Sequence, residues 1–349
     1  MIGQLVVVIV VALVIAGMVA PSESLGWWRR SHLGQRGIEW PTVEQAFSSP
    51  AHLAEVMPNA ERPDRLPPET EHYVVYLSGI GISTPDQLPV MEVPMVDRLR
   101  QRMGGTTLVS DIYAYSAENV ALTQGRRLSR LWQTLTRWKF EGHRLRGLGF
   151  LINLRNAFQV FVSADSRYGP VFNLAIAQQI AGALVRSGYV PEHRKPVTLL
   201  GWSGGAQVAA GAAWYLSALG MDVRLLSMAG TLSSDPGLDR CQQIWHLRGR
   251  ADRVQGISIA FSARRWVFYR NSSWNRAKRD GRLKFIGMGP LTHTGAGSYF
   301  AAEPLLPDGR EPRQAAADYI LGVLVDAGLA TDNFAADPAL PELGKPEQA

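Results

Sequence analysis

Short runs of aliphatic and aromatic residues alternate with longer stretches of helical spacing, and this alternation limits the fold more than any other feature of the chain. Strands are predicted at 72–77, 106–115, 196–200, 223–228, 243–247 and 283–286. Helices are predicted at 93–103, 171–187, 206–219 and 312–327. Because parallel strands need crossover connections, usually helices, we expect an α/β fold with a mostly parallel sheet and helices on both faces.

The chain of 349 residues is long enough for one large domain with appendages. Its hydrophobic content of 46%, against 19% charged residues, predicts a sizeable buried core. We expect the domain at 71–330, followed at 331–349 by a disordered tail rich in acidic residues and proline. The single cysteine, Cys241, excludes an intramolecular disulfide and every multi-cysteine metal site.

Residues 2–20 are apolar except for Gln4 and the small residues. At about 1.5 Å per residue, a helix of this length just matches a hydrocarbon core of roughly 30 Å. The segment 1–20 is therefore predicted to be an N-terminal transmembrane helix. The alternative is a signal peptide, but no lysine or arginine precedes the apolar run, and Met18 and Ala20 make a poor cleavage site.

The flanks of this segment predict its orientation. Trp27 and Trp28 suit a membrane interface, and three arginines follow at 29, 30 and 36. By the positive-inside tendency, this predicts a single-pass membrane protein whose main domain is cytoplasmic. Residues 21–70 are rich in proline and lack sustained periodicity, so they are predicted to be a juxtamembrane connector with one short helix near 43–47.

An insertion is predicted at about 117–170, because this connection is longer than an ordinary one. Within 123–155, leucines and tryptophans follow helical spacing and arginines fall on the opposite side. A second basic, aromatic stretch lies at 256–282. Two interpretations remain open: these segments rest on a membrane surface, or the first is a cap helix packed on the domain. The net charge of +6 would also suit nucleic acid, but no recognition motif supports such a partner.

Gly201-Trp202-Ser203-Gly204-Gly205 fits the pattern GxSxG. A predicted strand precedes the pentapeptide and an alanine-rich helix follows it, the setting in which a strained turn presents a serine hydroxyl above a sheet edge. Gly201 and Gly205 are expected where the turn packs against the helix and a strand, which leaves no room for a Cβ. The alternative is a structural glycine turn.

A serine hydroxyl needs a base and a group that orients the base before it can act as a nucleophile. Asp252 follows the predicted strand 243–247, and His293 follows the strand 283–286. Both are expected at the carboxyl edge of the sheet, where open α/β sheets gather reactive groups. Asp235 and Asp239 are the competing acids, and Asp235 precedes a proline, which is typical of a turn.

The region from 72 to 327 resembles the α/β-hydrolase family. The resemblance rests on the GxSxG turn at 201–205, followed along the chain by Asp252 and then His293, which is the order found in that family. The resemblance implies that Ser203 attacks a carbonyl, His293 transfers the proton and Asp252 orients His293. It also implies an oxyanion hole made by the amides of Gly204 and Ile80. Many members carry His-Gly where this chain has Ser78-Gly79.

The resulting expectation is a membrane-anchored serine hydrolase that cleaves a carboxylic ester or thioester, lipid-derived ones included, through an acyl-enzyme on Ser203. No cofactor or metal is implied. The substrate partner is a small-molecule or lipid ester, and the membrane is contacted through 2–20 and through 123–155 in one of the two interpretations above. The alternatives are an acyltransferase with the same three residues, or a non-catalytic, membrane-anchored scaffold of the same fold.

Overall fold

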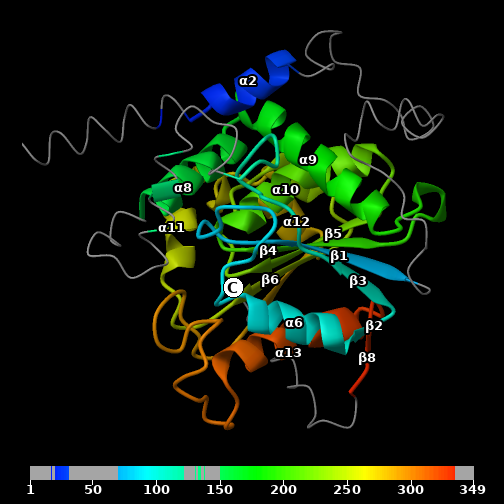
Figure 1. Cartoon of the computed structure of the whole chain (residues 1–349), viewed down its shortest axis with the longest axis vertical. Coiled ribbons are helices and arrows are strands. Elements are labelled where there is room, and N and C mark those ends of the chain that lie inside the picture. Colours follow the sequence, from blue (N-terminus) through cyan, green and yellow to red (C-terminus); the bar gives the residue numbers. More distant parts are fainter. Residues whose placement is uncertain are drawn as a thin grey trace, which may run out of the picture.

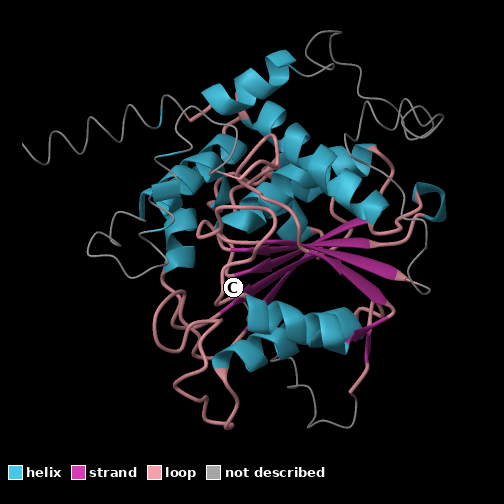
Figure 2. Cartoon of the chain, in the orientation of Figure 1, coloured by secondary structure: helices cyan, strands magenta, loops and turns pink. Residues whose placement is uncertain are grey.

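The computed structural model describes residues 17, 20–30, 70–121, 130, 133–134, 137 and 150–334. A central sheet lies between two layers of helices, as Figures 1 and 2 show. The sheet has six strands in the order β3-β1-β4-β5-β6-β7, and every adjacent pair is parallel. The predicted α/β class and parallel sheet are confirmed.

The strands are short, as expected for a buried parallel sheet. They are β1 (His72–Leu77), β3 (Thr106–Val109), β4 (Val197–Trp202), β5 (Val223–Met228), β6 (Ile244–Arg248) and β7 (Leu283–Gly287). In the register of β1 and β4, Tyr73 lies opposite Val197 and Leu77 opposite Gly201. Because all six strands run the same way, the loops that follow them meet at one edge of the sheet.

Successive residues of each strand face opposite layers, as the pleat of a strand requires. Val75 and Leu77 pack into the core under α9 and α10, whereas Val74 and Tyr76 pack into a second core under α6 and α13. Two hydrophobic cores, one on each face of the sheet, therefore hold the strands in place.

The two helical layers are unequal. One face carries α8 (Phe150–Ala164), α9 (Gly169–Arg186), α10 (Gly204–Ala218) and α12 (Ser273–Arg279), and the other carries α6 (Val93–Arg102) and α13 (Pro312–Asp326) (Figure 1). The helix α11 (Val254–Phe261) follows β6. The predicted helices correspond to α6, α9, α10 and α13, with bounds within two residues. The helices α8, α11 and α12 were not predicted.

One predicted strand is too long. The prediction runs from 106 to 115, but β3 ends at Val109. Beyond that point the buried Tyr113 and Tyr115 form hydrogen bonds with loop residues. The Tyr113 amide donates to the Asn119 side chain, and the Tyr115 hydroxyl donates to the Ser78 carbonyl at 2.9 Å. The aromatic alternation that resembled a strand is a buried loop packed against the end of β1.

The connector predicted at 21–70 begins with a helix, α2 (Ser22–Arg30). It packs against the domain: the Gln159 side-chain amide of α8 donates to the Ala20 carbonyl at 3.1 Å, and Arg155 forms an ion pair with Glu23. The short helix predicted near 43–47 lies outside the described residues. Among the described helices, none combines the length and the apolar character that a bilayer crossing requires. Most of the predicted span lies outside the described residues.

The tail predicted at 331–349 starts too early. Thr331–Asp332 form a short strand, β8, that pairs antiparallel with β2 (Met103–Gly104). Arg102 reinforces this pairing, because its guanidinium contacts both Asp332 and the buried Asp318. The folded part of the chain therefore reaches at least residue 334, and the remainder of the tail lies outside the described residues.

Candidate active site

Ser203 lies at the sharp turn between β4 and α10. Its backbone has φ 51° and ψ −119°, a left-handed conformation that is strained for any residue with a side chain. Two hydrogen bonds hold the turn: the Ser203 amide donates to the Met228 carbonyl at 3.0 Å, and the Thr231 amide donates to the Ser203 carbonyl at 3.1 Å. The neighbouring strand β5 and its following loop thus fix the strained residue.

The glycines on either side of the turn are required by close packing. A Cβ on Gly201 would lie 2.3 Å from the Ala206 Cα, and a Cβ on Gly205 would lie 2.4 Å from the Leu77 carbonyl oxygen. Both contacts are with backbone atoms, which cannot move aside cheaply. One glycine therefore lets the helix approach its own turn, and the other lets it approach β1.

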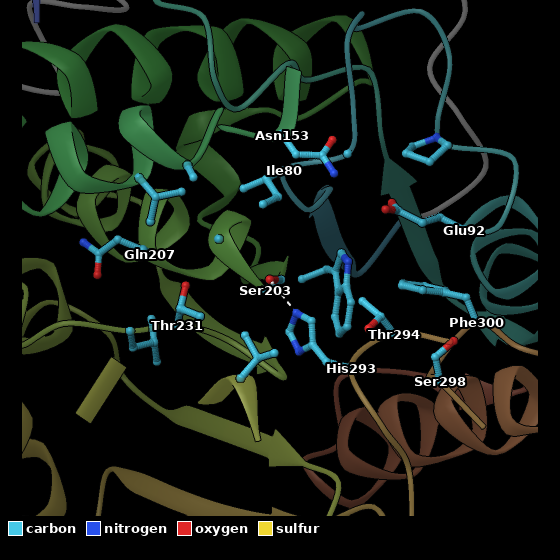
Figure 3. A pocket seen from close by; sticks show the side chains of 18 of the residues that line it. Ile80, Glu92, Asn153, Ser203, Gln207, Thr231, His293, Thr294, Ser298 and Phe300 are labelled. Carbon is cyan, nitrogen blue, oxygen red and sulfur yellow. Dashed lines mark hydrogen bonds between the residues drawn. The ribbon is translucent and has the colours of Figure 1, made fainter. Parts of the chain in front are cut away.

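Ser203, His293 and Asp252 form a continuous line of hydrogen bonds. The Ser203 hydroxyl lies 2.9 Å from His293 Nε2, drawn as the dashed line in Figure 3, and His293 Nδ1 lies 2.9 Å from Asp252 Oδ2. Asp252 follows β6 and His293 follows β7, so three separate loops at one sheet edge bring these groups together. The structure thus places side by side three residues that are far apart in the sequence.

Asp252 is held by several further donors. Its side chain is fully buried, and Oδ2 accepts hydrogen bonds from Gln255 at 3.0 Å and from the Tyr299 hydroxyl at 3.1 Å. Burial works to raise the pKa of Asp252, but the hydrogen bonds from His293, Gln255 and Tyr299 outweigh it and hold the pKa below its usual value. Asp252 is therefore ionised at neutral pH and fixed in orientation.

Trp202, the second residue of the GxSxG pentapeptide, packs against the imidazole of His293. The two rings stack with centroids 4.6 Å apart and an interplanar angle of 23°. Tyr299 and Phe300 contact the indole edge-on and hold it in place. The histidine ring is thus fixed by stacking on one side and by its two hydrogen bonds in the ring plane.

The competing candidates lie elsewhere. Asp235 is buried and bonds to Gln207 and the Gly237 amide; burial raises its pKa to about 6 against the opposing hydrogen bonds. Asp239 pairs with Arg276. Among the histidines, His246 is buried in β6 and bonds to Ser227 at 3.0 Å, and His72 is buried in β1. None of these bonds leads to Ser203.

Gly204 and Ile80, the two residues expected to supply backbone donors, face one another. Gly204 is the first residue of α10, so its amide has no acceptor within the helix. A Cβ on Gly204 would lie 3.0 Å from Ile80 Cγ2, which places the loop after β1 directly over the helix start. In the described part of the chain, no backbone hydrogen bond uses the Ile80 amide.

Ser203 and His293 line a pocket of about 500 Å³. This volume lies within the usual range for small-molecule sites, which is roughly 300–1,000 Å³. One wall comes from α8, through residues such as Val160 and Phe161, and the lining is mostly apolar, with a few polar groups that include Asn153 and Gln207 (Figure 3). The pocket therefore suits a largely apolar molecule that presents one polar centre to Ser203.

Several residues of this site were not predicted. Tyr299 and Gln255 hold Asp252, Trp202 stacks on His293, and α8 forms a pocket wall. Gln255 had a weak signal, because an Asp followed three positions later by Gln at a helix start resembles a capping pattern. Tyr299 and α8 had none, since only the fold brings them to the site.

No protein-family model matches the sequence, and no curated protein matches it.

Proposed function

We propose that this chain is a serine hydrolase that cleaves a carboxylic ester or thioester through an acyl-enzyme on Ser203. The observation that carries the proposal is the hydrogen-bonded line from Ser203 through His293 to the buried Asp252, with Ser203 and His293 lining an apolar pocket. A serine within reach of a histidine whose other nitrogen is held by a carboxylate is the arrangement that activates a serine nucleophile.

In the proposed reaction the Ser203 oxygen attacks the substrate carbonyl carbon while His293 Nε2 accepts the serine proton. His293 then gives this proton to the departing alkoxide or thiolate, which leaves as an alcohol or thiol. The acyl group remains on Ser203 as an ester. A water molecule attacks that ester in the second half, with His293 again taking and returning the proton. Asp252 keeps the histidine tautomer that makes both transfers possible.

The negative charge that develops on the carbonyl oxygen needs donors in place before the reaction. We assign this role to the amides of Gly204 and Ile80. Their proximity supports the assignment, as does the position of Gly204 at the start of α10, where the helix dipole also favours an anion.

The proposed family is the α/β-hydrolases. Two features support it: the strand order of the sheet, with the nucleophile after the strand β4, and the placement of Asp252 and His293 after the last two strands. Ser78-Gly79 in place of the His-Gly found in many members remains a departure. The apolar pocket favours an acyl or alcohol group that is hydrophobic, such as a lipid-derived ester.

A fluorophosphonate probe tests the proposal. The wild-type chain should be labelled and the Ser203→Ala variant should not, and a panel of esters and thioesters of increasing chain length would then define the substrate. Folded protein without Ser203-dependent labelling would instead support a non-catalytic scaffold. Labelling with product formed only when an alcohol, thiol or amine acceptor is added would identify an acyltransferase.

A further inference from the structure

The loop that carries Ile80 is held by a buried amide. Asn156 of α8 is fully buried, and its side-chain NH₂ donates to the carbonyl oxygens of Ile80 at 2.8 Å and of Ile82 at 2.7 Å. The Ile80 amide belongs to the Gly79–Ile80 peptide, whose carbonyl accepts a hydrogen bond from the Ile82 amide at 3.3 Å. Tyr115 holds the peptide before it, through the Ser78 carbonyl, and Asn156 holds the peptide after it, through the Ile80 carbonyl. Rotating either peptide would leave a buried polar group without its partner, which is costly, so the Ile80 amide is fixed from both sides.

The orientation of the Asn156 amide is fixed by its other partners. Arg155 donates to Asn156 Oδ1 at 2.9 Å, and the Tyr113 hydroxyl donates to the same oxygen at 3.0 Å. A guanidinium can only donate, so the oxygen of Asn156 must face Arg155 and the NH₂ must face the loop. Arg155 thus determines which end of the amide meets the Ile80 carbonyl.

Arg155 is itself held by the helix α2. Its guanidinium forms an ion pair with Glu23, and both side chains are largely buried, with 14% and 19% of their surface exposed. The path of contacts therefore runs from Glu23 through Arg155 and Asn156 to the Ile80 carbonyl, linking the segment next to the apolar N-terminal run with the pocket.

We propose that Asn156 is a positioning residue that aims the Ile80 amide at the reacting carbonyl, and that Arg155 and Glu23 hold Asn156 in the orientation that does so. This inference rests on the proposed function for its catalytic consequence. The helix α2 then contributes to the site, because removing the Glu23 carboxylate would free Arg155, the residue that orients Asn156.

The kinetic test uses Asn156→Asp. The new side chain keeps the shape, and as a carboxylate it can pair with Arg155, but it has no donor for the carbonyls of Ile80 and Ile82. Because loss of one oxyanion donor lowers kcat about 10²–10³-fold, a misaimed donor should lower it by about 10-fold or more with KM little changed. Arg155→Lys should give a smaller loss in kcat, and Glu23→Gln a smaller one still.

The matched control is Asn173→Asp. Asn173 is also a buried asparagine, bonded to Ser163 at the contact of α8 and α9, and it has no bond to the loop. It should lower the melting temperature without the selective loss in kcat. An equal fall of kcat in both variants would show that Asn156 acts only through stability and would overturn the proposal.

A second measurement does not depend on activity. Amide hydrogen exchange of the peptide spanning 78–82 should be faster in Asn156→Asp than in the wild type, and unchanged in Asn173→Asp. Unchanged exchange in Asn156→Asp would show that Asn156 does not fix the loop, and this result does not depend on which substrate the chain hydrolyses. If exchange rises but the wild type shows no Ser203-dependent labelling, the proposed function fails and the positioning role falls with it.

Discussion

Among the described residues, Ser203 is one of two serines whose side chains bond to a histidine, which provides a matched comparison. We expect Ser203→Ala to lower turnover by about 10³-fold or more while the fold is retained, because the change removes the attacking atom and little packing. Ser227 bonds to His246 at 3.0 Å inside the sheet, and Ser227→Ala should leave turnover within a few-fold of wild type. Steady-state ester hydrolysis measures both, and more than a tenth of wild-type activity in Ser203→Ala would contradict the assignment.

The acid of the site can be tested by exchanging carboxylates for amides. Asp252→Asn should reduce acylation by about 10³–10⁴-fold, because the amide would favour the wrong tautomer of His293. Asp235→Asn removes a buried carboxylate that bonds to Gln207 and should have a far smaller effect. Rates of acylation by an activated ester compare the two variants. If Asp235→Asn proves to be the crippling change, the acid has been wrongly identified.

Glu92 gives the stability of the fold a dependence on pH. Burial raises its pKa from 4.5 to about 7, against the opposing hydrogen bonds from Ser78, Tyr76 and the Gly79 amide. The folded chain thus binds this proton more tightly than the unfolded chain. The stability that the protonated group contributes is full below about pH 4.5 and is lost as the pH rises through about 7.

Glu92→Gln removes this buried charge and should therefore stabilise the fold at pH 8 by about 1–3 kcal/mol, with little difference from wild type at pH 5. Melting temperatures at the two pH values measure the effect. Glu71→Gln is the control, since Glu71 is exposed and pairs with Lys195. The prediction is contradicted if the difference in stability between Glu92→Gln and wild type is smaller at pH 8 than at pH 5.

At the scale of elements, the helix α10 can lie over the sheet only because its second residue has no side chain. Gly205→Ala should destabilise the fold by about 1–3 kcal/mol, because its Cβ would meet the backbone of β1 at 2.4 Å. Gly256→Ala in α11 is the control: its Cβ meets no atom within 4 Å, and alanine favours a helix. Chemical denaturation compares the two, and equal stability of both variants would show that α10 can shift away from β1.

The elements that end at clear breaking residues were predicted from the sequence. The helices α6, α9, α10 and α13 each end two residues before a glycine, and the buried strands are short apolar runs, so their bounds agree closely with the structure. The strand predicted at 106–115 failed beyond Val109, because apolar residues that alternate in a buried loop look the same as a strand. The helix α8 was missed because three of its five buried residues are polar, Asn156, Gln159 and Ser163, whereas its apolar Phe150 and Phe161 are exposed.

Some residues of the candidate site could be predicted from the sequence and others could not. Ser203, Asp252 and His293 could be predicted because each follows a strand, and the carboxyl ends of parallel strands meet at one edge. Asn156 and Tyr299 could not, since no spacing in the sequence indicates that Asn156 bonds to the loop after β1 or that Tyr299 bonds to Asp252. Trp274, one of the aromatic residues expected to rest on a membrane, is 4% exposed and packs in the core, whereas the nearby Phe268 is 85% exposed.

For the molecule as a whole, we propose that residues 2–20 span a membrane and that the basic, aromatic segments at 123–155 and 256–282 rest on its surface, except where they pack into the domain, as Arg155 and Trp274 do. Val267 and Phe268 are 75% and 85% exposed beside Arg264 and Arg270, which is the composition of an interfacial segment. The full-length protein should resist extraction by salt and carbonate. Deleting residues 1–20 should release it only in part, because binding to anionic lipid would persist at low ionic strength and fade as salt screens it.

Co-sedimentation of the truncated protein with liposomes tests this proposal, with and without anionic lipid and at low and high salt. Failure to sediment under every condition would mean that only the anchor touches the membrane. Recovery of the full-length protein in soluble form, shortened at its start, would identify residues 1–20 as a signal peptide.

The left-handed backbone at Ser203 has an evolutionary consequence. Glycine adopts this conformation with the least strain, whereas any residue with a side chain is strained there by about 1–3 kcal/mol. The most stable residue for the fold at position 203 is therefore not the one that the chemistry needs. A lineage of this chain that no longer needed the reaction could gain stability by replacing the serine with glycine, and a serine retained at this position across a lineage would record continued selection for its hydroxyl.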